Sequence, residues 1–413
     1  MGKDPRVVAM ARGESTQRTY FYELWRAGAA GVLETAGVTF LLLIAVLHFG
    51  AGSVAKGLVA GGGSLGLLLS PVVVSMVTAA GWTPARAASR ILFWGACSFL
   101  LAALWPTLTV YVVGGVIGMA SSASIIPLVT QMYQQNYPAH DRGRLFSRTV
   151  MVRILTAAVF SQLAGDFLSH HFEYYRWLLV CFAVALGLAS WCLARCPTQA
   201  LVSDGGAHPL RALRFVKIDP VFRLVLISWM MLGFGNLMML PLRVEYLANT
   251  KYGLTYSAGM IALLTGVLPN LARLCLSPFW GYLYDRMNFF LLRMVLNVGF
   301  ALGILLFFLS DSLTGLITGA LVYGISNAGG DVAWGLWVIK FAPADRVADY
   351  MSVHTFLTGV RGFLAPLLAF YLGGKLDSLT GLAWASCALI AVATLMLWSQ
   401  LGKSVSSPVI GNQ

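Results

Sequence analysis

Ionisable side chains stand inside stretches of this sequence that are otherwise apolar, and they are the residues that could do chemistry. Glu34 lies in G-V-L-E-T-A-G, and Asp331 lies in A-G-G-D-V-A. A carboxyl group in apolar surroundings favours its protonated form, which suits a group that takes up and releases protons. We therefore predict that Glu34 and Asp331 couple protons to function. The alternative for each is a structural partner to a neighbouring helix.

Basic and polar side chains lie at comparable depth in other apolar segments. Arg273 and Arg361 could bind an anionic solute, or each could pair with one carboxylate, because an uncompensated arginine there is costly. Arg153 is closer to the end of its segment, where it could also extend to water. We expect the side chain of Asp166 to be solvated. We expect that of His354 to be packed in the helix bundle. The residues predicted to add substrate specificity are Asn236, Asn270, Asn327, Trp334 and Gln131.

The composition places these segments in a membrane. Of 413 residues, 58% are hydrophobic and 11% are charged, with a mean hydropathy of +0.77. A soluble domain has about 25% charged residues. Apolar runs of about 18 residues or more cross a bilayer as helices, and runs of this length exclude a β-barrel. We expect an all-α polytopic membrane protein that contacts the lipid bilayer.

Twelve membrane spans are predicted, and one long polar segment divides them into two blocks of six. The spans are 25–49, 57–80, 89–105, 108–135, 146–168, 175–195, 222–245, 256–283, 290–310, 313–340, 348–373 and 379–401. The predicted parts are an N-terminal segment (1–24), a first bundle (25–195), a linker (196–221), a second bundle (222–401) and a tail (402–413). The linker is either a basic helix on the membrane surface or a disordered tether.

Basic residues predict the orientation. Most Lys and Arg fall in the N-terminal segment, the linker, the tail and the loops after even-numbered spans. The opposite side has only Lys56, Arg176, Arg243, Lys251 and Lys375. We therefore expect a protein of the bacterial inner membrane with both termini on the cytoplasmic side. The net charge of +12 then needs no nucleic acid partner.

The two blocks repeat one another. Ser70-Pro71 precedes Ser277-Pro278 by 207 residues, and Arg86 precedes Arg293 by the same interval. Asp141-Arg142 precedes Asp345-Arg346 by 204 residues, and Arg153 precedes Arg361 by 208. Four matches near half the chain length indicate a duplicated six-helix unit.

The segment G-Y-L-Y-D-R, from Gly281 to Arg286, resembles the loop between the second and third helices of each half of a major facilitator superfamily transporter. The resemblance covers about Tyr20 to Gln400. It implies twelve helices in two pseudo-symmetric bundles, working by alternating access. It also implies a cytoplasmic gate in which Asp285 faces the region from Gly143 to Ser147. The expected gate residues are Gly281, Asp285, Arg286, Arg293 and Arg142. In the first half, Val74, Thr78 and Ala79 replace the motif residues, so that lock should differ.

These features predict a monomeric secondary transporter, with proton-coupled uptake of a small polar or anionic solute as the first hypothesis. A drug or metabolite exporter that exchanges for protons is the alternative. No nucleotide-binding or H-E-x-x-H motif occurs, and we expect neither a cofactor nor an enzyme. A ligand-gated sensor on a transporter scaffold is a weaker alternative. The six cysteines have no metal-ligand spacing, and no metal is expected.

Overall fold

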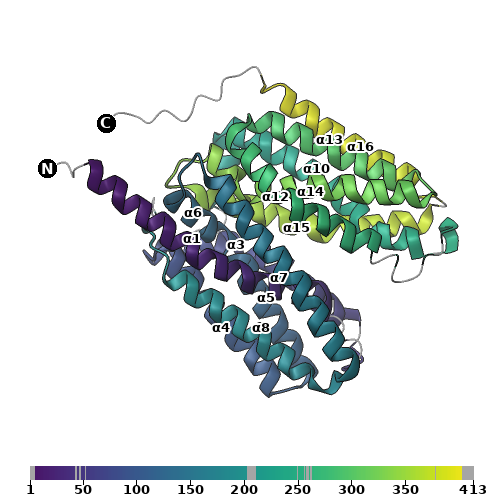
Figure 1. Cartoon of the computed structure of the whole chain (residues 1–413), viewed down its shortest axis with the longest axis horizontal. Helices are drawn as coiled ribbons and strands as arrows, with labels where there is room; N and C mark the ends of the chain where they lie inside the picture. Colours follow the sequence, from purple (N-terminus) through teal and green to yellow (C-terminus); the bar gives the residue numbers. More distant parts are fainter. Residues whose placement is uncertain are drawn as a thin grey trace. The chain divides into compact units, whose positions relative to one another are not determined.

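The computed structural model describes residues 5–41, 44–45, 48–51, 53–201, 211–248, 250–254, 256, 260, 263–376 and 378–401. Within these residues the chain is helical and contains no strand. It divides into two compact units (Figure 1). Unit 1 comprises residues 1–213 together with 344–359, and unit 2 comprises residues 214–343 together with 360–413.

Unit 1 contains the purple to teal helices of Figure 1. They are α1 (Pro5–Thr35), α3 (Ser53–Ala79), α4 (Pro84–Leu104), α5 (Leu108–Ser124), α6 (Ile126–Asn136), α7 (Arg142–His170) and α8 (Tyr175–Ala194). A π-helical turn, Ala36–Phe40, continues α1, and a 3-10 turn, Phe172–Tyr174, precedes α8. The first part of α15 (Val347–Lys375) also belongs to this unit.

Unit 2 contains the helices of the second block. They are α9 (Arg214–Ile218), α10 (Pro220–Ala248), α12 (Leu268–Arg286), α13 (Phe289–Phe308), α14 (Leu313–Phe341), the rest of α15, and α16 (Thr380–Trp398). A π-helical turn, Leu263–Val267, leads into α12. Asn288 caps α13 by accepting from the backbone N–H of Phe290 and Leu291, and Ser312 caps α14 by accepting from that of Gly315.

The two units repeat the same packing. In unit 1, α3 packs on α5, α4 packs on both α5 and α8, and α1 packs on α8. In unit 2 the matching pairs are α12 on α14, α13 on both α14 and α16, and α10 on α16. Both Ser-Pro steps are also used alike, since Ser70 and Ser277 are buried and donate to the carbonyl four residues earlier. The predicted all-α architecture with duplicated bundles is confirmed.

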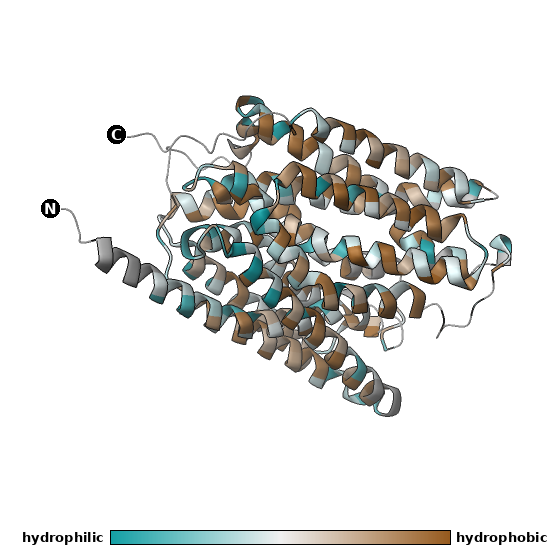
Figure 2. Ribbon diagram, turned by 45° about the horizontal axis from the view of Figure 1, so that its top comes forward, coloured by the Kyte–Doolittle hydropathy of each residue, from teal (hydrophilic) through white to brown (hydrophobic). Residues whose placement is uncertain are grey.

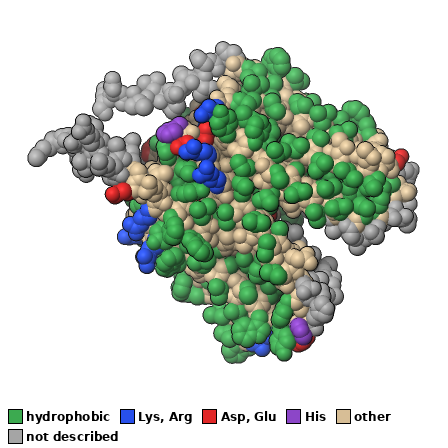
Figure 3. Space-filling view, viewed as in Figure 1, with side chains coloured by type: hydrophobic (Ala, Val, Ile, Leu, Met, Phe, Trp, Pro, Cys, Tyr) green, Lys and Arg blue, Asp and Glu red, His purple; other side chains and the backbone are tan. Residues whose placement is uncertain are grey.

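The surfaces are those of a membrane protein. Seven described segments are long and apolar enough to cross a membrane by length and composition. The predicted spans outside that set lie on α1, α7, α12, α14 and α15, which carry the deep ionisable residues. Brown, hydrophobic positions run along the helices in Figure 2, and hydrophobic side chains cover most of the visible surface in Figure 3. Large apolar side chains such as Trp94, Leu163 and Leu395 are exposed, as contact with lipid would allow.

Several predicted span boundaries differ from the structure, and two of these differences bear on the fold. The helix expected to start at residue 25 begins at Pro5, because the polar N-terminal residues continue the same helix. The span expected at 108–135 is divided at Ile125 into α5 and α6. Pro127 follows that break, and a proline has no N–H with which to continue the helical ladder. The linker contributes the short α9, while residues 202–210 lie outside the described part.

The packing of α12 on α14 depends on Gly324, and this generates a prediction. A Cβ at Gly324 would lie 2.7 Å from both Cα and O of Pro269, whereas a Cβ at Gly187 on α8 would meet nothing within 4 Å. We expect Gly324→Ala to lower the free energy of unfolding by about 1–3 kcal/mol, because the backbones must separate. Gly187→Ala should be neutral or stabilise by up to about 1 kcal/mol through helix propensity. Thermal unfolding of the purified variants measures both. Equal effects would contradict the close approach.

Candidate functional site

Three of the predicted residues come together between α12 and α14. The Arg273 Nη2 and Nε atoms donate to Oδ2 of Asp331 over 2.6 and 3.1 Å, and Nη1 donates to Oδ1 of Asn270 over 2.7 Å. The side chains of Arg273 and Asp331 are 12% and 22% exposed, so both ends of the ion pair are accessible. We call Asn270, Arg273 and Asp331 the α12–α14 cluster.

Two more predicted residues share a helix face with Asp331. Asn327 lies four residues before it and Trp334 three residues after it on α14, a spacing that puts all three side chains on one side of the helix. All three are partly exposed, while the glycines behind them are buried. A Cβ at Gly329 would overlap the rings or chains of Trp280 and Leu296. Close packing on that side therefore turns the polar face away from the helix contacts.

Next to this face lie two residues that the sequence did not suggest as part of a site. Tyr323 of α14 is buried and lies within hydrogen-bonding reach of Asn236 of α10. The guanidinium carbon of Arg243 lies 4.2 Å from the Tyr323 ring centroid. The charges of Arg273 and Asp331 also act on Tyr323. Asn236 was predicted to bind substrate. Through Tyr323 it lies near the α12–α14 cluster, and its role in binding stays a prediction.

The position of Arg243 differs from the one assumed when basic residues were assigned to the two sides of the membrane. The sequence placed it at the end of a span, among basic residues facing water. The structure includes it in α10 and leaves it only 6% exposed. Its Nε and Nη1 atoms have no hydrogen-bond partner, and among the described residues it has no carboxylate within ion-pair distance. Because α10 continues to Ala248, its position within the helix could have been found only by predicting a longer span.

In unit 1 the two candidate charges form an ion pair. Arg153 Nε of α7 lies 3.2 Å from Oε2 of Glu34 on α1, and the side chains are 33% and 35% exposed. Glu34 therefore has a partner on the neighbouring helix, which was the structural alternative, while its exposure keeps the proton-coupling role open to test. The side chain of Asp166 lies outside the described residues.

Gln131, also predicted to bind substrate, lies elsewhere in unit 1. Its Nε2 donates to the carbonyl of Ala344 over 2.7 Å, and its Oε1 accepts from the N–H of Ala348 over 3.0 Å. The amide thus holds the start of α15, and it is 1% exposed. His354, farther along α15, is completely buried, in line with a packed histidine.

The predicted gate residues occupy the ends of α7, α12 and α13. Gly281 is buried, Asp285 is partly exposed in the last turn of α12, and exposed Arg286 donates to the Tyr282 hydroxyl. In unit 1, buried Arg142 donates to the carbonyl of Tyr137 over 3.0 Å. The expected contact of Asp285 with residues 143–147 would join the two units, and it stays a prediction.

Arg293 and Arg361 both contact Trp229 of α10. The Arg293 guanidinium carbon lies 3.5 Å from the ring centroid of Trp229. The Arg361 Nη1 group donates to the backbone carbonyl of the same tryptophan. Arg293, expected in a charge relay with Asp285, thus has an aromatic partner, and Arg361 has a backbone partner.

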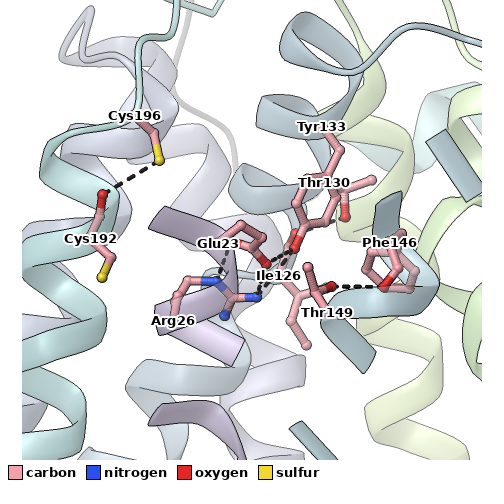
Figure 4. A network of polar contacts seen from close by, with 9 residues as sticks. All are labelled: Glu23, Arg26, Ile126, Thr130, Tyr133, Phe146, Thr149, Cys192 and Cys196. Atoms are coloured by element: carbon pink, nitrogen blue, oxygen red, sulfur yellow. Dashed lines mark hydrogen bonds and ion pairs between the residues drawn. The ribbon is translucent and has the colours of Figure 1, made fainter. Parts of the chain in front are cut away.

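A buried network in unit 1 was missed because its acidic residue precedes the predicted span. Figure 4 shows Glu23 accepting from Arg26 and from the Tyr133 hydroxyl. Glu23 is completely buried, and the network joins α1 to α6. Nearby, burial and then the Glu23 charge raise the pKa of Cys196 to about 12, so this thiol stays protonated. The Glu-x-x-Arg spacing was the only available signal, and it is common on exposed helices.

Comparisons with known proteins agree on one family and fold. The sequence profile described as Major Facilitator Superfamily matches residues 27–366. No curated protein sequence matches the chain significantly. The E. coli fucose:proton symporter FucP is similar in structure, with a TM-score of 0.71 and 13% identity over 94% of this chain and 98% of that one.

Two further solved structures share the fold. The human organic anion transporter MFSD10 has a TM-score of 0.68 and 15% identity, covering 96% of this chain and all of that one (100%). The proton:xylose symporter XylE has a TM-score of 0.68 and 14% identity, covering 95% of this chain and 96% of that one. At these identities the likeness establishes the fold.

The Glu23 network generates a stability prediction. Glu23→Gln removes the negative charge and leaves Arg26 without its ionic partner. We expect a loss of about 2–4 kcal/mol in the free energy of unfolding. Adding Arg26→Gln should restore part of that loss, because the uncompensated charge is then gone. A double-mutant cycle from unfolding curves measures the coupling. Additive effects of the two substitutions would contradict a coupled pair.

Proposed function

This chain belongs to the Major Facilitator Superfamily, and from that premise we propose that it couples the movement of a small organic anion to that of a proton at the α12–α14 cluster. The observation that carries the proposal is the ion pair between Arg273 and Asp331. Arg273 can bind an anion, and it is paired with Asp331, which can take up a proton. Asn270 fixes the arginine from its own helix.

The charges of the pair supply a coupling rule. With the site empty, Arg273 and Asp331 neutralise each other. An organic anion that binds Arg273 releases Asp331, whose charge would then be uncompensated in surroundings of low dielectric constant. A proton on Asp331 removes that charge. The empty site and the site with both anion and proton are therefore favoured, while binding of either one alone is penalised.

The surroundings of the pair favour an anion as solute. Arg243 adds a second positive charge beside Tyr323, with no carboxylate partner among the described residues. Tyr323 and Asn236 can donate hydrogen bonds to a carboxylate, and Asn327 and Trp334 share the face of Asp331. A mostly apolar wall with a few convergent polar groups is typical of small-molecule sites.

The names of the structurally similar proteins agree with a proposal that involves a proton and an organic anion. FucP and XylE are named as proton symporters, and MFSD10 as an organic anion transporter. Those activities belong to the named proteins, and for this chain they are part of a proposal. For this chain, the proposal includes alternating access of the two bundles, cytoplasmic termini and the gate at Asp285.

Glu34 with Arg153 is the competing place for proton coupling, because it is a second accessible ion pair. Reconstitution in liposomes separates the two. Asp331→Asn should abolish solute accumulation driven by a pH gradient and spare counterflow, since an amide cannot exchange a proton. Glu34→Gln should keep gradient-driven accumulation. The reverse result would move the coupling to unit 1, and acid-driven efflux in place of uptake would identify an exporter.

Binding generates a second prediction. A thermal-stability screen with monocarboxylates, dicarboxylates, sugars and cationic drugs should find stabilisation by carboxylates, because ligands stabilise the state they bind. Arg273→Met and Arg243→Met should each weaken carboxylate binding about 10- to 100-fold, the loss of a hydrogen bond to a charged group worth about 1.5–3 kcal/mol. The matched control is Arg223→Met, which removes an exposed arginine of the same α10. Stabilisation by cations alone would contradict the anion proposal.

A further inference from the structure

A second group of positive charges lies in unit 2, in contact with Trp229. Arg293 comes from α13, Arg361 from α15 and Trp229 from α10, so three helices meet there. Arg293 lies over the indole ring, and Arg361 binds the backbone carbonyl of the same residue. The Arg361 charge acts directly on Arg293. We call Arg293 and Arg361 the arginine pair.

Both members of the arginine pair are buried, and no described residue serves either of them as an acidic partner. Arg293 is 1% exposed and Arg361 is 8% exposed. The Arg293 Nη1 and Nη2 atoms and the Arg361 Nε atom have no hydrogen-bond partner in the part of the chain that the structure describes. Among the described residues, neither guanidinium has a carboxylate within ion-pair distance, in contrast to Arg273. Two like charges buried next to each other repel, and each unsatisfied N–H group adds a desolvation cost.

The residues around the arginine pair leave room for the guanidinium groups and contact them. A Cβ on Gly233 of α10 would overlap the Arg361 guanidinium, so the glycine makes the room for it. The Trp229 ring covers one face of Arg293 and supplies a cation–π contact. That contact leaves the N–H groups at the edge of the guanidinium unused. The site therefore accommodates both cations and still has donors to offer.

The sequence repeat shows how the first half solves the same problem. Arg153 occupies the position 208 residues before Arg361, and it is neutralised by Glu34 of α1. The counterpart of α1 in unit 2 is α10, which gives Arg361 a backbone carbonyl and a glycine but, among its described side chains, no carboxylate. In the described part of unit 2, the equivalent arginine is therefore present without a carboxylate partner.

We propose that the arginine pair binds a small monovalent inorganic anion, such as chloride, which links α13 and α15 against Trp229 of α10. The anion takes the place that Glu34 has in unit 1. A monovalent anion is favoured because the site is closed and the cost of removing hydration water is much larger for multivalent ions. A spherical anion also accepts from the edges of two guanidinium groups without a fixed orientation. The site is distinct from the α12–α14 cluster, and its anion is a resident part of the bundle.

Thermal unfolding of the purified full-length protein tests the proposal. Sodium chloride is titrated against sodium methanesulfonate, a monovalent salt without a carboxylate, at constant ionic strength. The wild-type Tm should rise in a saturable manner by a few degrees, and bromide should replace chloride. Arg361→Glu supplies an internal carboxylate to Arg293, as Glu34 does to Arg153. This variant should unfold without chloride dependence, and in methanesulfonate at a Tm no lower than that of the wild type.

Arg223→Met, an exposed arginine on α10, is the control and should keep the wild-type chloride response. A wild-type Tm independent of chloride would overturn the proposal, and so would an unchanged chloride response in Arg361→Glu. If the variant does not fold, crystals of the wild type grown in bromide decide. An anomalous peak between Arg293 and Arg361 supports the site, and its absence there refutes it.

Discussion

Positive charge buried in the second bundle is the constraint on which the account depends. Arg243, Arg273, Arg293 and Arg361 all lie inside unit 2, and Asp331 is the carboxylate paired there with one of them. Each uncompensated guanidinium in a membrane-embedded bundle costs several kcal/mol unless an anion, a ring or a dipole compensates it. Rings and carbonyls compensate some of this charge in the structure. The remaining excess is what makes anions the expected ligands of this unit.

The duplicated halves have diverged in how they neutralise equivalent arginines. Unit 1 uses carboxylates from its own helices, with Glu34 for Arg153 and Glu23 for Arg26. Among the described residues of unit 2, Arg273 and Asp331 form such a pair. The asymmetry first visible in the decayed motif of the first half therefore extends to the buried charges.

The helical spans and the repeat could be predicted from the sequence because they depend on local hydrophobicity and on spacing. The presence of deep charges was equally visible, since a single Arg273 or Asp331 stands out among apolar neighbours. Their pairing could not be derived, because the two residues are 58 positions apart and depend on the contact between α12 and α14. The fate of Gln131 was also hidden, since an amide gives no sign of whether it will bind substrate or backbone. Arg243 and Glu23 were missed at span edges, where one helical turn decides between water and core.

The exchange of partners by Arg273 is tested most directly by counting protons during binding. Purified protein in a weakly buffered solution with a pH-sensitive dye is mixed with a carboxylate found to stabilise it. The account predicts that about one proton is taken up from solution per anion bound by the wild type, because Asp331 is protonated as Arg273 leaves it. Asp331→Asn should bind the anion with no uptake. Anion binding by the wild type without proton uptake, or equal uptake by the variant, would contradict the coupling at this pair.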